Sequence, residues 1–165
     1  MNTIQTILHP TDFSESADHA FRLACSLARD HEARLVLLHV VPSTAPVAGG
    51  MLVGSFSYDN PDEVDSTLTD RMEAMRESHE GLAIEWRLSK GNVIDGILAA
   101  AEDVEAGLIV LGTHGRTGLT RLLMGSIAEN IVRKATCSVL TVKTPISHRP
   151  AETGYAERPI AATPY

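Results

Sequence analysis

Short apolar runs alternate along the chain with stretches in which apolar residues recur every three or four positions. Four of the runs are rich in aliphatic residues, as in strands that are buried on both faces of a parallel sheet. They are Thr3–His9, Leu35–Val41, Leu108–Leu111 and Ser138–Val142. A fifth run, Leu82–Leu88, alternates apolar with polar side chains, which predicts a strand at the edge of the sheet.

The stretches between these runs have the period of amphipathic helices, and four helices are predicted. Their apolar faces are formed by Ala17, Ala20, Phe21, Ala24 and Ala28; by Val64, Leu68, Met72 and Met75; by Ile94, Ile97, Leu98 and Ala101; and by Ile127, Ala128, Ile131, Val132 and Ala135. Capping-box spacing predicts helix starts at Asn92, with Asp95 three residues on, and at Ser126, with Glu129 three residues on.

Strands that alternate with helices pair in parallel through right-handed crossovers. The predicted fold is therefore an α/β domain with an open five-stranded parallel sheet and helices on both faces. With the amphipathic strand at an edge, the strand order is 3-2-1-4-5, a Rossmann-like arrangement. Ligands of such sheets bind beyond the carboxyl ends of the strands where the winding reverses, here between the first and fourth strands. The connections Pro10–Ser14 and Thr113–Gly125 are the predicted ligand loops.

One domain is predicted over residues 1–143. Two connections, Pro42–Pro61 and Thr113–Met124, are longer than the usual two to six residues and are expected to be functional or mobile. The remaining segment, 144–165, carries four prolines and little apolar periodicity. It is expected to be a flexible C-terminal extension or a partner-binding arm.

Charge and cysteine content narrow the classes of function. The formal net charge is −7, which argues against nonspecific nucleic-acid binding and against a polybasic membrane anchor. The two cysteines, Cys25 and Cys137, form no C-x-x-C pair and are expected to be reduced thiols rather than a disulfide. No signal peptide or apolar run of about 20 residues is evident, so the expected location is the cytoplasm, without membrane attachment.

A glycine-rich segment, GTHGRTGLTRLLMGS, follows the fourth predicted strand and opens the last helix. Its spacing is G-x2-G-x9-G-S, with Gly112, Gly115, Gly125 and Ser126 at the fixed positions. Glycines let backbone N–H groups converge on an anion, and a helix start adds free donors and a favourable dipole. Between Gly112 and Lys134 one acid, Glu129, stands against four basic residues, which predicts a focused basic spot at this loop: Arg116, Arg121, Arg133 and Lys134. Among them Arg116 is the best candidate for phosphate contact, because its planar fork matches phosphate oxygens.

Purely structural roles remain open for several of these residues. Gly112 could end a strand, Gly118 could form a turn, and Ser126 could be only an N-cap. Asp12 could cap the first helix, with Glu15 three residues on. The seven histidines lack metal-ligand spacing, and His9 and His39 are expected to be core histidines with satisfied hydrogen bonds.

The glycine-rich segment resembles the ATP-binding signature of the universal stress protein family. The opening ILHPTDFSESADHAF and the HVV of the second strand are similar to the same family, and the resemblance covers roughly Thr3–Lys143. It implies an adenine nucleotide α-hydrolase-like domain that binds ATP, with Mg²⁺ as an optional companion. Asn92 and Val93 depart from the family, where many members have proline after Gly91.

The resemblance implies a role for each matching residue. Pro10, Thr11 and Asp12 would flank the adenosine, with Asp12 near the ribose or a metal ion, and Val41 would meet adenine through its backbone. The residues implied around the phosphates are Gly112, His114, Gly115, Arg116, Gly125, Ser126 and Ile127. Ser138 would approach the base or the ribose.

Three functions remain open at this stage. The leading hypothesis is a nucleotide-dependent switch in a stress response, in which nucleotide orders the two long loops and changes the surface shown to unknown protein partners. The first alternative is a slow ATPase or phosphoryl-transfer enzyme on the same fold, although no catalytic motif is evident beyond His114 in the phosphate loop. The second is an assembly module with a structural nucleotide. A homodimer is also expected, because the predicted edge strand Ser138–Val142 is apolar and uncharged and because the resemblance implies it.

Overall fold

Five strands and four helices alternate in the described parts of the chain. In the computed structural model these parts are residues 4–43, 66–79, 81–113 and 124–143. The elements are β1 (Thr6–Pro10), α1 (Glu15–Asp30), β2 (Arg34–Pro42), α2 (Ser66–Glu77), β3 (Ile84–Gly91), α3 (Val93–Asp103), β4 (Leu108–Gly112), α4 (Ser126–Lys134) and β5 (Ser138–Val142). None of the helices in these ranges is long and apolar enough to cross a bilayer.

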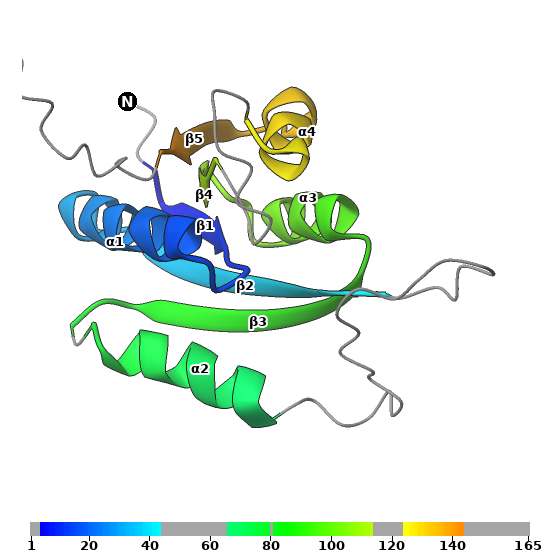
Figure 1. The fold of residues 1–165 in the computed structure, drawn as a ribbon. Helices are drawn as coiled ribbons and strands as arrows, with labels where there is room; N and C mark the ends of the chain where they lie inside the picture. Colours follow the sequence, from blue (N-terminus) through cyan, green and yellow to red (C-terminus); the bar gives the residue numbers. More distant parts are fainter. Residues whose placement is uncertain (1–3, 44–65, 80, 114–123, 144–165) are drawn as a thin grey trace, which may run out of the picture.

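The strands form one parallel sheet in the order β3-β2-β1-β4-β5 (Figure 1). The predicted fold class, strand order and edge position of the amphipathic strand are thereby confirmed. The strand boundaries differ by a few residues from those predicted. Leu82, for example, belongs to a turn, in which its N–H donates to the carbonyl of His79, and β3 begins two residues later, at Ile84.

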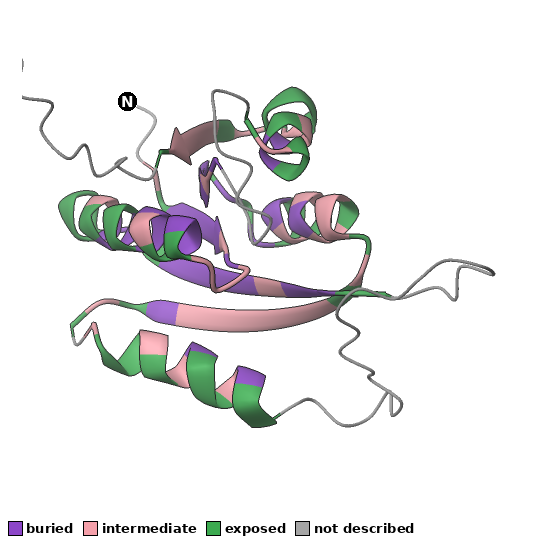
Figure 2. Cartoon of the chain, in the orientation of Figure 1, coloured by how far each residue is buried: buried purple, intermediate pink, exposed green. Residues whose placement is uncertain are grey.

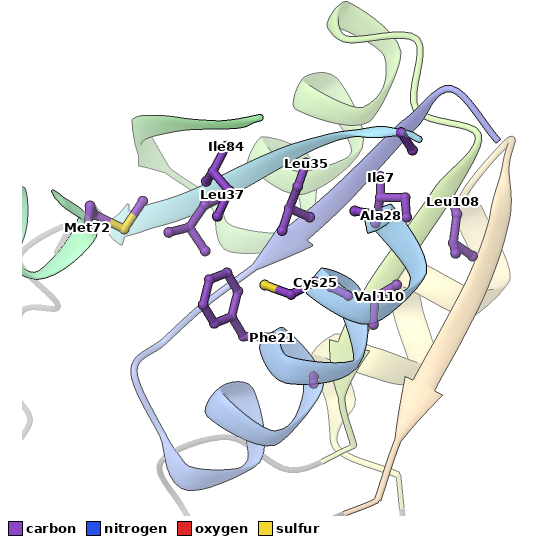
Figure 3. Packing of buried hydrophobic residues seen from close by; sticks show 13 residues of the cluster. Ile7, Phe21, Cys25, Ala28, Leu35, Leu37, Met72, Ile84, Leu108 and Val110 are labelled. Atoms are coloured by element: carbon purple, nitrogen blue, oxygen red, sulfur yellow. The ribbon is translucent and has the colours of Figure 1, made fainter. Parts of the chain in front are cut away.

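The helices cover both faces of the sheet. On one face α1 and α2 pack on the strands through a cluster that includes Phe21, Cys25, Leu37 and Met72 (Figure 3). On the other face α3 and α4 pack through Ile97, Ala101, Ala128 and Ile131. Figure 2 shows the buried residues concentrated in β1, β2 and β4.

Both cysteines are free, as expected, and Cys25 lies within the first cluster. Burial raises the pKa of its thiol to about 11, so the group stays protonated at neutral pH.

The helix starts follow the predicted pattern only in part. Asn92 caps α3, because its side chain accepts hydrogen bonds from the N–H groups of Ile94 and Asp95. The start of α1 is capped by Ser14 rather than by Asp12, and the Ser14 hydroxyl accepts from Ala17 at 3.2 Å. At α4 the N-cap is Gly125, so the prediction that Ser126 is the cap is wrong, and Ser126 is the first helical residue.

The pairing of β1 with β4 stops before either strand ends. The register pairs are Ile7 with Leu108 and Leu8 with Ile109. Thr11 donates its N–H to β2, so alternation along the strand turns the backbone of Pro10 toward β4. Proline has no N–H to donate, and it therefore ends the β1–β4 ladder.

The side chain of His9 replaces the missing donor. Its Nδ1 lies 2.8 Å from the carbonyl oxygen of Val110, the acceptor beyond the last pair of the ladder. The acceptor requires that Nδ1 carry the proton, so Nε2 is the unprotonated nitrogen of this neutral ring. His9 is fully buried, and Nε2 has no hydrogen-bond partner among the described residues. His9 is thus a core histidine, as predicted, but only one of its nitrogens is satisfied.

Gly112 ends β4 where α1 comes closest to the sheet. A Cβ atom at this position would lie 2.4 Å from Oγ of Ser16 and 2.9 Å from its carbonyl carbon and oxygen. Two of these three atoms belong to the helix backbone, so no rotation of a side chain relieves the clash. The absence of a side chain at residue 112 therefore lets the first turn of α1 rest on the end of β4.

We expect Gly112→Ala to lower the free energy of unfolding by about 1–3 kcal/mol, because the backbone of α1 must move to accept a methyl group. Urea unfolding followed by circular dichroism measures the change. Gly107→Ala is the matched control, since the nearest atoms to a Cβ there are 3.8 Å away. Equal destabilisation by the two substitutions would contradict the role assigned to Gly112.

Stability is expected to depend on pH through His9. Burial lowers the pKa of His9 from 6.5 to about 4 in the folded protein, while its hydrogen bond to Val110 and the Asp12 carboxylate act in the opposite direction. The unfolded chain thus binds a proton that the folded chain does not. This contribution to stability is complete above pH 6.5 and is lost progressively as the pH falls toward 4. The loss amounts to roughly 3 kcal/mol.

His9→Asn separates this term from the titration of carboxylates, because asparagine offers an N–H donor to Val110 and does not titrate. Urea unfolding between pH 4 and pH 6.5 is expected to give a shallower slope for this variant than for the native chain. Identical slopes would mean that His9 carries no such linkage.

Candidate functional site

The predicted ligand loops begin side by side at the carboxyl ends of β1 and β4 (Figure 1). From this edge, the chain after Pro10 turns into α1, and the chain after Gly112 leads to α4. The ladder between the two strands ends before this edge, so the ligand loops start where the sheet parts. Ligands of doubly wound sheets bind at this place, beyond the carboxyl ends of the strands.

The turn from β1 into α1 is held by its own polar groups. Thr11 donates its N–H to the carbonyl of Leu38 at 2.8 Å, which ties the turn to β2. Its hydroxyl accepts from the N–H of Phe13 at 3.0 Å. One oxygen of Asp12, Oδ1, accepts from the N–H of Ser14 at 3.0 Å. This Asx turn fixes the Asp12 carboxylate in the half-buried turn beside the end of β4.

The start of α4 is tied to the end of β4. The N–H of Gly125 donates to the carbonyl of Thr113 at 2.8 Å, and the N–H of Thr113 donates to Val142 in β5 at 3.0 Å. The first intrahelical bond of α4 runs from Glu129 to Gly125. The N–H groups of Ser126, Ile127 and Ala128 precede this bond and have no partner within the helix. Together with the helix dipole, they suit a bound anion.

Three of the predicted phosphate contacts, His114, Gly115 and Arg116, lie outside the described residues. Seven of the predicted site residues lie at or after the carboxyl ends of the neighbouring strands β1 and β4: Pro10, Thr11 and Asp12 on the β1 side, and Gly112, Gly125, Ser126 and Ile127 on the β4–α4 side. Ser126 and Ile127 are both exposed, and Ile127 retains 41% of its accessible surface.

The basic residues near this loop are spread more widely than predicted. Arg133 and Lys134 lie in the last turn of α4, roughly 12 Å along the helix from Ser126. Arg133 also forms an exposed ion pair with Glu129 at 3.7 Å. Neither side chain adds positive charge at the helix start, so the expectation of one local basic spot fails for these two residues.

Val41 is near the site, but its backbone is turned away from it. Leu38 accepts a hydrogen bond from the β1 side, whereas Ser43 donates to Gly91 of β3. Alternation along β2 therefore turns the backbone of Val40 toward β1 and that of Val41 toward β3. Val40 is the residue placed for backbone contact at the site. Counting backbone direction from the β1 pairing would have found it.

Ser138 is at the amino-terminal end of its strand, whereas the predicted site is at the carboxyl ends of the strands. It begins β5 and pairs with Leu108, the first residue of β4. Parallel strands all start at one end of the sheet and finish at the other end, and four residues of strand span about 13 Å. The prediction that Ser138 contacts the ligand is therefore wrong. The position of Ser138 beside a predicted strand was misleading, because residues at the start and at the end of a strand lie at opposite ends of the sheet.

The described residues contain no group of three or more His, Cys, Asp or Glu side chains that could hold a metal ion. Asp12 is the residue at this place whose carboxylate could serve as a ligand of a metal ion. An ion at this place would therefore take its remaining ligands from a bound phosphate chain or from water.

Comparisons with known proteins agree with this architecture. A model of the universal stress protein family matches residues 3–143. Universal stress protein MJ0531 of Methanocaldococcus jannaschii is 33% identical over 146 residues, which cover 87% of this chain and 85% of the relative.

Two solved structures have the same fold. The structure of protein MJ0577, also from Methanocaldococcus jannaschii, is 26% identical, with a TM-score of 0.68 over 88% of this chain and 99% of the other. A universal stress protein from Archaeoglobus fulgidus in complex with dAMP is 24% identical, with a TM-score of 0.58 over 87% and 100% of the two chains. On the family match, the relatives and the shared fold, this chain belongs to the universal stress protein family.

Proposed function

We propose that this protein binds an adenine nucleotide, with ATP as the expected ligand, across the carboxyl ends of β1 and β4. The observation that carries the proposal is the start of α4, which is tied to the end of β4 and has three backbone N–H groups without a partner within the helix. The half-buried Asp12 turn lies on the neighbouring strand. An anion site beside a carboxylate suits a molecule with a phosphate chain and a hydroxyl-bearing sugar.

The chemistry of the described residues fits such a ligand. The phosphates would lie against Gly125, Ser126 and Ile127, where the helix dipole and the Ser126 hydroxyl favour negative charge. Asp12 would accept hydrogen bonds from ribose hydroxyls, because a carboxylate in contact with phosphate would repel it. The base would extend toward Val40 at the end of β2. Mg²⁺ would enter with the phosphates.

The family supports an adenine nucleotide as the ligand. A protein of the same fold from Archaeoglobus fulgidus is described in complex with dAMP. We further propose that ATP acts as a switch in the cytoplasm, where the nucleotide changes the surface offered to protein partners. A dedicated enzyme is not part of this proposal.

Ser126→Ala tests the site. We expect nucleotide affinity to fall about 10- to 100-fold, the usual effect of losing a hydrogen bond to a charged group. Stability should change little, because Ser126 is the first helical residue and not the cap. Isothermal titration calorimetry with MgATP measures the affinity, and urea unfolding measures the stability.

Ser138→Ala is the matched control, since it removes the same hydroxyl at the opposite edge of the sheet and should leave affinity unchanged. Equal affinities of the two variants would contradict the assigned phosphate site. The switch adds that MgATP alters limited proteolysis of the native chain and alters it less in Ser126→Ala. A cleavage pattern that ignores saturating MgATP would count against the switch.

A homodimer through β5 is the proposed assembly. β5 is an edge strand whose residues after Ser138 are half-buried in the single chain. The backbone of Val142 accepts from Thr113, so the backbones of Val139 and Thr141 face away from β4 and are available to a second copy. Light scattering at micromolar concentration is expected to give twice the chain mass of 17.7 kDa.

Thr141→Pro is expected to give a folded monomer. It removes an outward N–H while leaving the bonds to β4 in place, and proline is tolerated on the outer side of an edge strand. A native chain that is monomeric in this measurement, or a Thr141→Pro variant that remains dimeric, would exclude this interface.

A further inference from the structure

Phe13, between Asp12 and Ser14, has a backbone conformation that is rare for its residue type. Its φ is 60°, in the left-handed region that glycine adopts without strain. Such a conformation costs free energy and persists only where the surroundings enforce it, and it occurs preferentially at ligand sites. Contacts from the rest of the domain must therefore hold Phe13 in this conformation.

Groups from two other elements hold the ring and the backbone beside it. The guanidinium carbon of Arg71, on α2, lies 4.1 Å from the centre of the Phe13 ring. The ring of His39, on β2, lies 4.8 Å from the same centre at an interplanar angle of 40°. His39 also binds the carbonyl of Thr11 through Nδ1 at 2.7 Å. Phe13, His39 and Arg71 are called the Phe13 clamp below.

We propose that Arg71 is a positioning residue for the nucleotide, and that it acts through the Phe13 clamp. The Arg71 guanidinium packs on the ring of Phe13. The N–H of Phe13 donates a hydrogen bond to the Thr11 hydroxyl. Asp12 is fixed between these two residues by its bond to Ser14. The clamp therefore keeps the Asp12 carboxylate in one orientation before the sugar arrives. The inference rests on the proposed nucleotide site and adds to it a residue from α2.

The alternative role for an exposed arginine near this site is direct contact with phosphate. In the structure the Arg71 guanidinium lies over an aromatic face on the β1–α1 side, whereas the proposed phosphate site is at the start of α4. The two roles differ in their dependence on the ligand. A positioning residue affects every ligand that carries the ribose equally, while a phosphate ligand affects ATP more than AMP and loses its effect in high salt.

The test compares Arg71→Ala, Arg71→Lys and the control Arg76→Ala, which removes an arginine from the same helix. Calorimetric titration with adenosine, AMP and ATP is expected to show a loss of affinity of about two- to fivefold for Arg71→Ala, equal for the three ligands. Arg71→Lys, which keeps a cation over the ring, should recover part of the loss, and Arg76→Ala should show none. A loss that grows from adenosine to ATP and shrinks with salt overturns the proposal, as does no loss.

A second variant tests whether Arg71 acts through the ring. In a Phe13→Leu background, Arg71→Ala is expected to cause no further loss, because the aromatic face that the cation contacts is gone. Additive losses overturn the proposed route through Phe13.

A nucleotide-free measurement separates this inference from the proposed function. Arg71→Ala should speed amide hydrogen exchange at Phe13 and Ser14 in the free protein, since both N–H groups are bonded within the clamped turn. If the native chain binds none of the three ligands, the proposed function fails whatever the exchange shows. If it binds them and exchange at both amides is unchanged in Arg71→Ala, the proposed function stands and the clamp is overturned.

Discussion

The hydrogen bond between His9 and Val110 is the contact on which the arrangement of the site depends. It joins residues 101 positions apart at the point where the backbone ladder between β1 and β4 has ended. Pro10 cannot continue that ladder because it has no N–H, and an imidazole therefore supplies the next donor. Beyond this bond the two strands need no longer follow each other. One chain then turns into α1 and the other leads to α4.

Two further constraints shape the site at these strand ends. The missing side chain of Gly112 lets the first turn of α1 sit against the end of β4, which brings the start of α1 close to Gly112. The hydrogen bonds of Thr113 and Gly125 then hold the start of α4 at the same edge. The two sides carry complementary chemistry, with acceptor groups on the β1 turn and donor groups at the helix start. A ligand with sugar hydroxyls at one end and anionic oxygens at the other matches this polarity.

The fold could be predicted from the sequence because its signals are periodic and local. Aliphatic runs located the strands, the alternation of Leu82–Leu88 identified an edge strand, and the switch point then followed from topology alone. Ser138–Val142 was even predicted with its exact bounds. The sequence also located a helix start near Gly125 and a strand end near Pro10, since glycine and proline mark helix starts and strand ends.

The errors concern direction and distance, which a linear pattern does not encode. Val41 and Val40 differ by half a strand period, and only the pairing with β1 reveals which backbone faces the site. Ser138 is close to the glycine-rich segment in sequence, but it lies at the amino-terminal end of the strands, away from the site. Arg133 and Lys134 were grouped with the loop although a helix carries them away from it. The contact of Arg71 with Phe13 joins α2 to the first turn and has no sequence signature.

A backbone hydrogen bond between Thr113 and Gly125 joins the two ends of the segment between these residues. The start of α4 is therefore anchored to the end of β4, and Ala128 and Ile131 hold the helix in the core. The residues between Thr113 and Gly125 take no part in these contacts, so their substitution leaves the contacts in place. Recognition can therefore change by substitution in this segment while the contacts that fold the domain stay the same.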